Sequence, residues 1–192
     1  MKLLTIAIPS YNVERYLPNC LNSLIKVASQ NKLEILIVND GSTDKTASIA
    51  DSFATKYSDF IALINKENGG HGSAINTALS IASGKYFMVL DGDDQVNSAD
   101  LDTLISIIEK VDVDLISTNY ERIDIQTGVV NPVIQQGICY NRIYSFEELN
   151  VNNIYFALAN SCFRTELLIK NNIILQENTF YVDDEYILLP IP

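Results

Sequence analysis

Apolar residues in the first hundred positions form short continuous runs separated by stretches with helical spacing. Four runs are continuous enough to be buried strands, at residues 3–8, 33–38, 60–64 and 86–90. Between them, apolar side chains recur every three or four positions, as in amphipathic helices: Leu17, Leu21, Leu24 and Ala28, then Ile49, Ala50, Phe53 and Tyr57, then Ile75, Ala78, Leu79 and Ala82. This alternation predicts an α/β fold, with a mostly parallel sheet flanked by helices and right-handed crossovers.

Local signals predict where several of these elements begin and end. Pro9 is expected to end the first strand, and Pro18 fits only the first turn of a helix that begins near Leu17. Ser42 is a candidate N-cap for the second helix. Gly84 is placed to stop the third helix at its C-terminus.

The pattern becomes less regular in the second half of the chain. The expected elements there are helices at 101–108, 164–170 and 182–189, a strand at 115–119, and short strands or loops over 121–162. With no internal repeat and no flexible linker in sight, we expect a single domain over residues 1–192. It divides into a regular half, 1–97, and a less regular half, 98–192.

Charge and composition exclude several classes of partner. The formal net charge of −11 argues against binding to nucleic acid or a polybasic membrane anchor, whereas a phosphate-bearing ligand remains compatible if a bound metal supplies positive charge. The sequence holds no apolar run of about 18 residues, so no membrane span is expected. Its three widely spaced cysteines form neither a disulfide framework nor a zinc pattern, which favours a reducing cytoplasm.

Polar or glycine-rich segments follow each of the four predicted strands. They are residues 9–12, 39–42, 68–72 and 91–94. Ligands of parallel α/β sheets bind outside the carboxyl ends of the strands, so these segments should meet at one edge and form a site.

The acidic segment has two interpretations when it is considered alone. Asp91, Asp93 and Asp94 surround one glycine directly after a buried strand. Their mutual repulsion would be relieved by a hard divalent cation such as Mg²⁺ or Mn²⁺. Alternatively, they form an acidic surface turn that caps the next helix.

The remaining candidates are also ambiguous one at a time. Asp40 could accept hydrogen bonds from a base or ribose, or bond to its own backbone in a turn, and Tyr11 could stack on a base. The loop at 68–72 matches neither the P-loop nor the dinucleotide fingerprint. His71 is the only histidine, which excludes a multi-histidine metal site. The acids at 183–185 could cap a helix or include a general base.

Taken together, the motifs resemble glycosyltransferase family 2 with the GT-A fold, a Rossmann-like α/β architecture. The matching segments are Ile8-Pro9-Ser10-Tyr11-Asn12-Val13-Glu14, Val38-Asn39-Asp40-Gly41-Ser42-Thr43-Asp44, Asn68-Gly69-Gly70, Ala82-Ser83-Gly84-Lys85-Tyr86 and Leu90-Asp91-Gly92-Asp93-Asp94. Their order and spacing match the donor-binding half of the family, so residues 1–97 should bind a nucleotide sugar and residues 98–192 should face the acceptor.

The resemblance implies a role for each residue of the donor site. Pro9 and Tyr11 would line the nucleoside pocket, Asp40 would contact the base, usually uracil, and Gly70 would bring backbone near the diphosphate. In the Asp-x-Asp motif, one of Asp91 and Asp93 would contact ribose or sugar and the other the divalent metal. We assign the metal, Mn²⁺ or Mg²⁺, to Asp93, with Asp91 and Asp94 as further candidates.

The catalytic base is expected in the late acidic motif of the family. Aligned on residues 181–186, the motif selects Asp183, and a shift by one selects Asp184. The implied reaction is inverting transfer of a hexosyl or N-acetylhexosaminyl group from a nucleotide sugar, with UDP expected, to a saccharide or lipid-linked hydroxyl acceptor in cell-surface polysaccharide synthesis. It would take place in the cytoplasm or at the inner face of the plasma membrane.

Two departures from the family pattern bear on this reading. Ile75 stands in Ala74-Ile75-Asn76 where many relatives have arginine, so any donor contact of that arginine is missing. The chain ends soon after the expected base, whereas relatives usually continue into helices that cover the acceptor or approach a membrane. We therefore expect a truncated acceptor half, and any membrane association to require a missing C-terminal part.

Three alternatives to a transferase share some of these features. A haloacid-dehalogenase-type phosphatase needs Thr or Val where Gln95 stands, and a nucleotidyltransferase needs a basic, glycine-rich loop after the first strand. The third is a nucleotide-sugar-binding module without activity.

Overall fold

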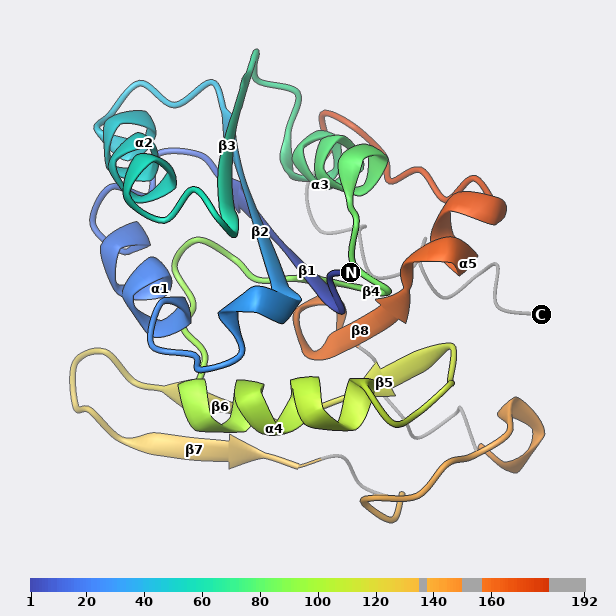
Figure 1. The fold of residues 1–192 in the computed structure, drawn as a ribbon. Coiled ribbons are helices and arrows are strands. Elements are labelled where there is room, and N and C mark those ends of the chain that lie inside the picture. The colour runs from blue at the N-terminus through green and yellow to red at the C-terminus, as the bar shows by residue number, and fades with distance from the viewer. Residues whose placement is uncertain (135–137, 150–156, 180–192) are drawn as a thin grey trace.

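A six-stranded sheet forms the centre of the computed structural model, which describes residues 1–134, 138–149 and 157–179 (Figure 1). Its strands, in spatial order, are β3 (Ile61–Lys66), β2 (Leu33–Asp40), β1 (Leu4–Ser10), β4 (Tyr86–Val89), β8 (Ser161–Arg164) and β5 (Leu115–Ser117). The first four are parallel, and β8 runs antiparallel to both β4 and β5. The predicted α/β fold with a mostly parallel sheet is thus confirmed.

Helices cover both faces of the sheet. Every residue of β1 and β4 is therefore buried. One face packs against α1 (Leu17–Leu24), α2 (Thr46–Lys56) and α4 (Ser98–Ile108), with side chains such as Ile6, Ile35 and Met88 in a common cluster. The other face packs against α3 (His71–Ile81) and α5 (Thr165–Lys170), around Ala7, Leu36 and Phe163. Strand side chains alternate between the two clusters, as the pleat requires.

The second half of the chain completes this sheet and adds a small separate one. β5 and β8 pair at its far edge, while β6 (Tyr120–Ile123) and β7 (Val130–Val133) form an antiparallel hairpin. In the part of the chain that the structure describes, short 3₁₀ turns lie at Gln30–Lys32, Phe146–Glu148 and Leu158–Asn160. The helix expected at 182–189 lies outside the described residues. Among the helices that the structure describes, none is long and apolar enough to cross a membrane.

The element ends predicted at Pro9 and Ser42 are wrong, each for a tertiary reason. β1 continues through Pro9 because its pairing with β4 ends at Ala7, so the missing proline N–H falls where a ladder partner is absent. α2 begins at Thr46, and Ser42 does not cap it. Instead, the hydroxyl of Ser42 accepts a hydrogen bond from the N–H of Asn12 at 3.1 Å.

Gly84 is required by close packing, and its predicted role as a helix stop is wrong. α3 ends at Ile81, and Ala82 is already extended. A Cβ on Gly84 would overlap the backbone of Thr5, whose hydroxyl accepts the Gly84 N–H at 2.9 Å. The same hydroxyl donates to Glu34 at 2.6 Å, and Glu34 also accepts the N–H of Ser83 at 2.7 Å. This hydrogen-bond network links the amino ends of β1, β2 and β4, which we call the amino edge of the sheet.

Gly84→Ala should therefore destabilise the chain by about 1–3 kcal/mol, the usual cost of overpacking a filled core. Urea denaturation followed by circular dichroism measures the loss. Ser80→Ala, on the exposed face of α3, is the control and should leave the midpoint unchanged. Equal midpoints for Gly84→Ala and the wild type would contradict the packing argument.

Candidate functional site

The four polar loops meet at the carboxyl edge of the sheet, as predicted. A hydrogen bond from Asn12 to Ser42 joins the loops after β1 and β2. Asp40 bonds to the glycine loop (residues 68–72) after β3. His71 Nε2 lies 3.8 Å from Asp91 Oδ1, which links the glycine loop to the acidic loop (residues 91–94) after β4. The sheet thus brings residues 9–12, 39–42, 68–72 and 91–94 together.

The loop after β1 is fixed by reciprocal hydrogen bonds with the loop after β2. Asn12 adopts a left-handed φ of 53°, and its side-chain oxygen accepts the N–H of Thr43 at 2.8 Å. Glu14 accepts the N–H of Lys45 at 2.9 Å. Pro9 is buried beneath this crossing, and Tyr11 remains 51% exposed at the turn. The ring of Tyr11 is therefore available for stacking.

Asp40 is the most constrained of the predicted donor residues, with only 3% of its surface exposed. Its Oδ1 accepts hydrogen bonds from Lys66 Nζ at 2.7 Å and from the Gly69 N–H at 3.0 Å. Its Oδ2 accepts the Gly70 N–H at 2.8 Å. Gly70 has a backbone φ of 87°, which residues other than glycine rarely adopt. The carboxylate therefore holds the glycine loop in place.

The carboxylates of the acidic loop repel one another as the sequence suggested. The pKa of Asp94 is raised, first by partial desolvation and then by the charges of Asp91 and Asp93. Below the loop, the Cys20 thiol lies 3.8 Å from the carbonyl oxygen of Asp91. Burial and then the charges of Asp94, Asp93 and Asp91 raise the pKa of Cys20 to about 12, so this thiol stays neutral. The carboxylates of Asp91, Asp93 and Asp94 therefore lie close enough to interact with one another and with Cys20.

A segment from the end of the chain also reaches this edge. Residues 175–178, which we call the strap, follow α5 and return to the glycine loop, where the Asn178 N–H donates to Gly69 O at 2.8 Å. Asp183 and Asp184, the two candidates for the base, lie outside the described residues. Lys66, Asn76 and the strap were missed from the sequence, because nothing local in their neighbourhood announces partners so distant along the chain.

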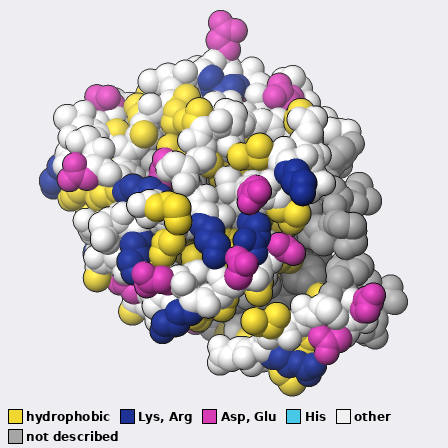
Figure 2. Space-filling model, turned by 45° about the vertical axis from the view of Figure 1, so that its right-hand side comes forward, with side chains coloured by type: hydrophobic (Ala, Val, Ile, Leu, Met, Phe, Trp, Pro, Cys, Tyr) yellow, Lys and Arg dark blue, Asp and Glu magenta, His cyan; other side chains and the backbone are white. Residues whose placement is uncertain are grey.

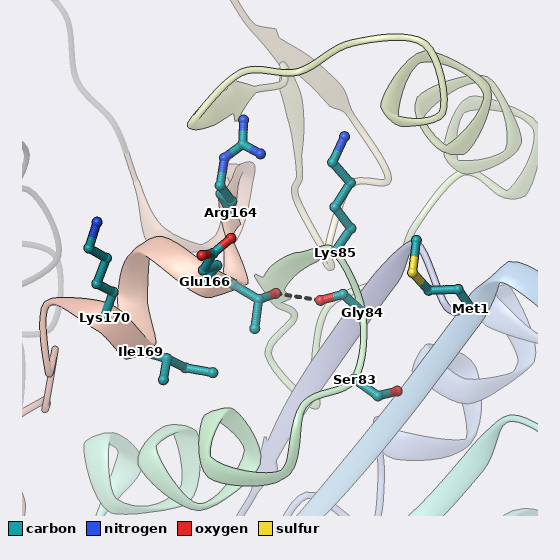
Figure 3. A pocket seen from close by; sticks show the side chains of 9 residues that line it. Met1, Ser83, Gly84, Lys85, Arg164, Glu166, Ile169 and Lys170 are labelled. Carbon is teal, nitrogen blue, oxygen red and sulfur yellow. Dashed lines mark hydrogen bonds between the residues drawn. The ribbon is translucent and has the colours of Figure 1, made fainter.

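A surface pocket of about 530 Å³ lies away from these loops, at the amino end of β4 (Figure 3). Its basic walls include Lys85 and Arg164, which both pair with Asp112, at 3.3 and 2.7 Å. On the face shown in Figure 2, Lys and Arg side chains alternate with Asp and Glu. The pocket contains none of the residues predicted to form the site.

Comparison with known proteins gives a consistent result. The profile described as "Glycosyl transferase family 2" matches residues 5–169. The chain is 29% identical over 186 residues to the uncharacterized glycosyltransferase EpsJ of Bacillus subtilis, covering 95% of this chain and 54% of EpsJ. It is 33% identical over 127 residues to the glycosyltransferase GlyG of Streptococcus pneumoniae, covering 66% of this chain and 42% of GlyG.

Solved structures agree with the sequence relatives. A crystal structure of Staphylococcus aureus TarS 1–349 in complex with UDP superimposes with a TM-score of 0.78 at 25% identity, covering 96% of this chain and 53% of that one. The chain thus spans about half the length of the relatives and structures it matches. The family match over most of the chain, together with the same fold, shows that this chain belongs to glycosyl transferase family 2.

Proposed function

We propose that the chain transfers a hexosyl or N-acetylhexosaminyl group from a UDP-sugar to a hydroxyl acceptor, with inversion at the anomeric carbon. The observation that carries this proposal is the joining of four loops with donor-site motifs at one edge of the sheet. Support for UDP comes from the TarS structures, which were solved with UDP and with UDP-GlcNAc. A curated relative, 27% identical, is named poly(ribitol-phosphate) beta-N-acetylglucosaminyltransferase.

The proposed donor site follows the edge of the sheet. We assign Pro9 and Tyr11 to the wall of the nucleoside pocket. This assignment is compatible with a buried Pro9 at the strand end and an exposed Tyr11 two residues later. Asp40 faces the base, and Gly70 and Asp91 line the path toward the diphosphate and sugar. Since Asp40 also holds the glycine loop, base recognition and loop conformation depend on the same carboxylate.

The acidic loop fits a divalent cation that the donor helps to bind. No group of three or more His, Cys, Asp or Glu side chains in the described part of the chain could hold a metal by itself. Mg²⁺ and similar ions are often held by one or two carboxylates together with substrate phosphates. We assign this contact to Asp93, with Asp91 and Asp94 beside it. When bound, Mn²⁺ or Mg²⁺ would offset the negative charge that develops on the leaving diphosphate.

We assign the general base to Asp183, with Asp184 as the alternative. The base takes the proton of the acceptor hydroxyl as its oxygen attacks the anomeric carbon from the face opposite the diphosphate. In sequence, Asp183 follows the strap by five positions, and the strap is bonded to the glycine loop. We propose a saccharide or lipid-linked acceptor, cell-surface polysaccharide synthesis as the pathway, and the cytoplasm or inner membrane face as the location.

A calorimetric titration with UDP, with and without Mn²⁺, tests the donor and metal assignments. Asp93→Ala should weaken Mn²⁺-dependent UDP binding by about tenfold or more, because a contact with a charged group contributes roughly 1.5–3 kcal/mol. Gln95→Ala, in the same exposed stretch, is the control. An unchanged UDP affinity of Asp93→Ala in the presence of Mn²⁺ would show that Asp93 does not hold the metal.

Asp183→Asn should lower the rate of Mn²⁺-dependent UDP-GlcNAc hydrolysis by about 10²–10⁴-fold, the usual contribution of a general base. UDP affinity should stay at the wild-type value, because a general base is proposed to act on the acceptor hydroxyl and not on the nucleotide. Asp184→Asn provides the comparison, and the base is reassigned to Asp184 if only that variant is inactive. A wild-type chain that binds UDP and never turns over UDP-sugars would instead be a binding module.

In buffer that contains a chelator, so that no metal is bound, Asp94→Asn should raise the Tm near neutral pH by about 1–3 °C. The raised pKa means that the folded chain holds this proton more tightly, so stability falls as the pH rises above the ordinary value of 3.8. The gain should therefore shrink as the pH is lowered toward about 4. Asp51→Asn, on the exposed surface of α2, controls for net charge. Equal gains in both variants at every pH would show that local repulsion is negligible.

A further inference from the structure

The strap is anchored by the side chain of Leu175, which is only 3% exposed. It packs in the core cluster that contains Ala74 and Ala78 of α3. The remaining strap residues are exposed, so burial fixes the position of the strap at one end only. Polar contacts must fix the rest.

Asn76 supplies those contacts from the middle of α3. Its Oδ1 accepts the Leu175 N–H at 2.9 Å, and its Nδ2 donates to Leu175 O at 3.0 Å and to Glu177 Oε1 at 3.3 Å. The side-chain amide thereby satisfies both backbone groups of one strap residue, as a neighbouring strand would. Asparagine is a poor helix former, so its place inside α3 is explained by this pairing and not by the helix.

Gly72 lets the strap approach the first turn of α3. A Cβ at this position would overlap the carbonyl oxygen of Gln176. Glycine costs a helix interior about 1 kcal/mol relative to alanine. Glycine at position 72 is therefore explained by the close approach of the strap backbone to the backbone of α3.

The strap is also continuous with the donor site through hydrogen bonds. Asn178 donates its N–H to Gly69 O at 2.8 Å, while the N–H of Gly69 donates to Asp40 at 3.0 Å. A change in the glycine loop on donor binding therefore acts directly on the strap. Asn76 and Gly72 both contact the strap. Gly72 is the last residue of the glycine loop, but neither residue is assigned a donor contact.

We propose that Asn76 and Gly72 are positioning residues that dock the strap on the glycine loop, and so couple donor binding to the acceptor side of the site. This inference rests on the proposed function. Turnover then requires both residues, whereas donor affinity does not. The reason is geometric: a misplacement of about 1 Å between reacting groups can lower a rate by about 10²-fold without loss of substrate binding.

Hydrogen exchange of the full chain, with and without UDP and Mn²⁺, tests the coupling in the peptide that contains residues 173–179. In the wild type, UDP should increase protection of this peptide. Asn76→Ala removes the hydrogen bonds to Leu175, and Gly72→Ala adds a Cβ that pushes the strap away. One variant loses atoms and the other gains them, but both should abolish the increase in protection that UDP causes. Because Gly72→Ala favours the helix intrinsically, it guards against a loss caused by unfolding of α3. Ser80→Ala is the matched control and should behave as the wild type.

Kinetics and calorimetry on the same proteins separate positioning from donor binding. In Asn76→Ala and Gly72→Ala, kcat for UDP-GlcNAc hydrolysis should fall by about tenfold or more, while KM and the calorimetric Kd for UDP stay within about twofold. A wild-type chain that does not bind UDP overturns the proposed function. If the wild type binds UDP but hydrogen exchange in the strap changes neither with UDP nor in the variants, the inference is wrong and the proposed function stands. A rise in KM with kcat unchanged in the two variants also overturns the inference alone.

Discussion

The carboxylate of Asp40 is the contact on which the carboxyl edge depends. A buried charge is stable only when it is paired and hydrogen-bonded, and Asp40 meets this requirement with donors from Lys66, Gly69 and Gly70. These donors tie the end of β2 to the end of β3 and to the start of α3. Because Gly70 must take a left-handed φ to donate its N–H, the entry into α3 follows from the same constraint.

The two edges of the sheet differ in how their charges are satisfied. At the amino edge, Glu34 is fully engaged by Thr5 and Ser83, and Arg164 is held between Asp112 and Asp114. At the carboxyl edge, Asp91, Asp93 and Asp94 raise one another's energy when ionised. A bound divalent cation would relieve this repulsion, and its positive charge would then allow a phosphate-bearing ligand to approach the acidic loop.

The sequence was sufficient for features that depend on local periodicity or on the family pattern. Buried parallel strands show as continuous apolar runs, so the first four strands and the meeting of their loops could be predicted. Contacts between distant segments could not: Asn76 and Leu175 are 99 positions apart, and a helical asparagine has no pattern that names its partner. The same limit explains the errors at Ser42 and Gly84, whose contacts come from segments far away along the chain. The functional roles of all the predicted site residues remain predictions: Pro9, Tyr11, Asp40, Gly70, Asp91, Asp93 and Asp183.

The place of β8 between β4 and β5 has a consequence for how the chain folds. β4, which leads into the acidic loop, lies at an open edge until residues 161–164 have been synthesised and paired with it. During that interval a short, wholly buried strand exposes unpaired backbone groups, the arrangement that invites pairing with other chains. Closing the sheet across some 75 residues is also a non-local step and therefore a slow one. Residues 1–97 alone would therefore leave β4 as an unprotected edge strand beside the acidic loop.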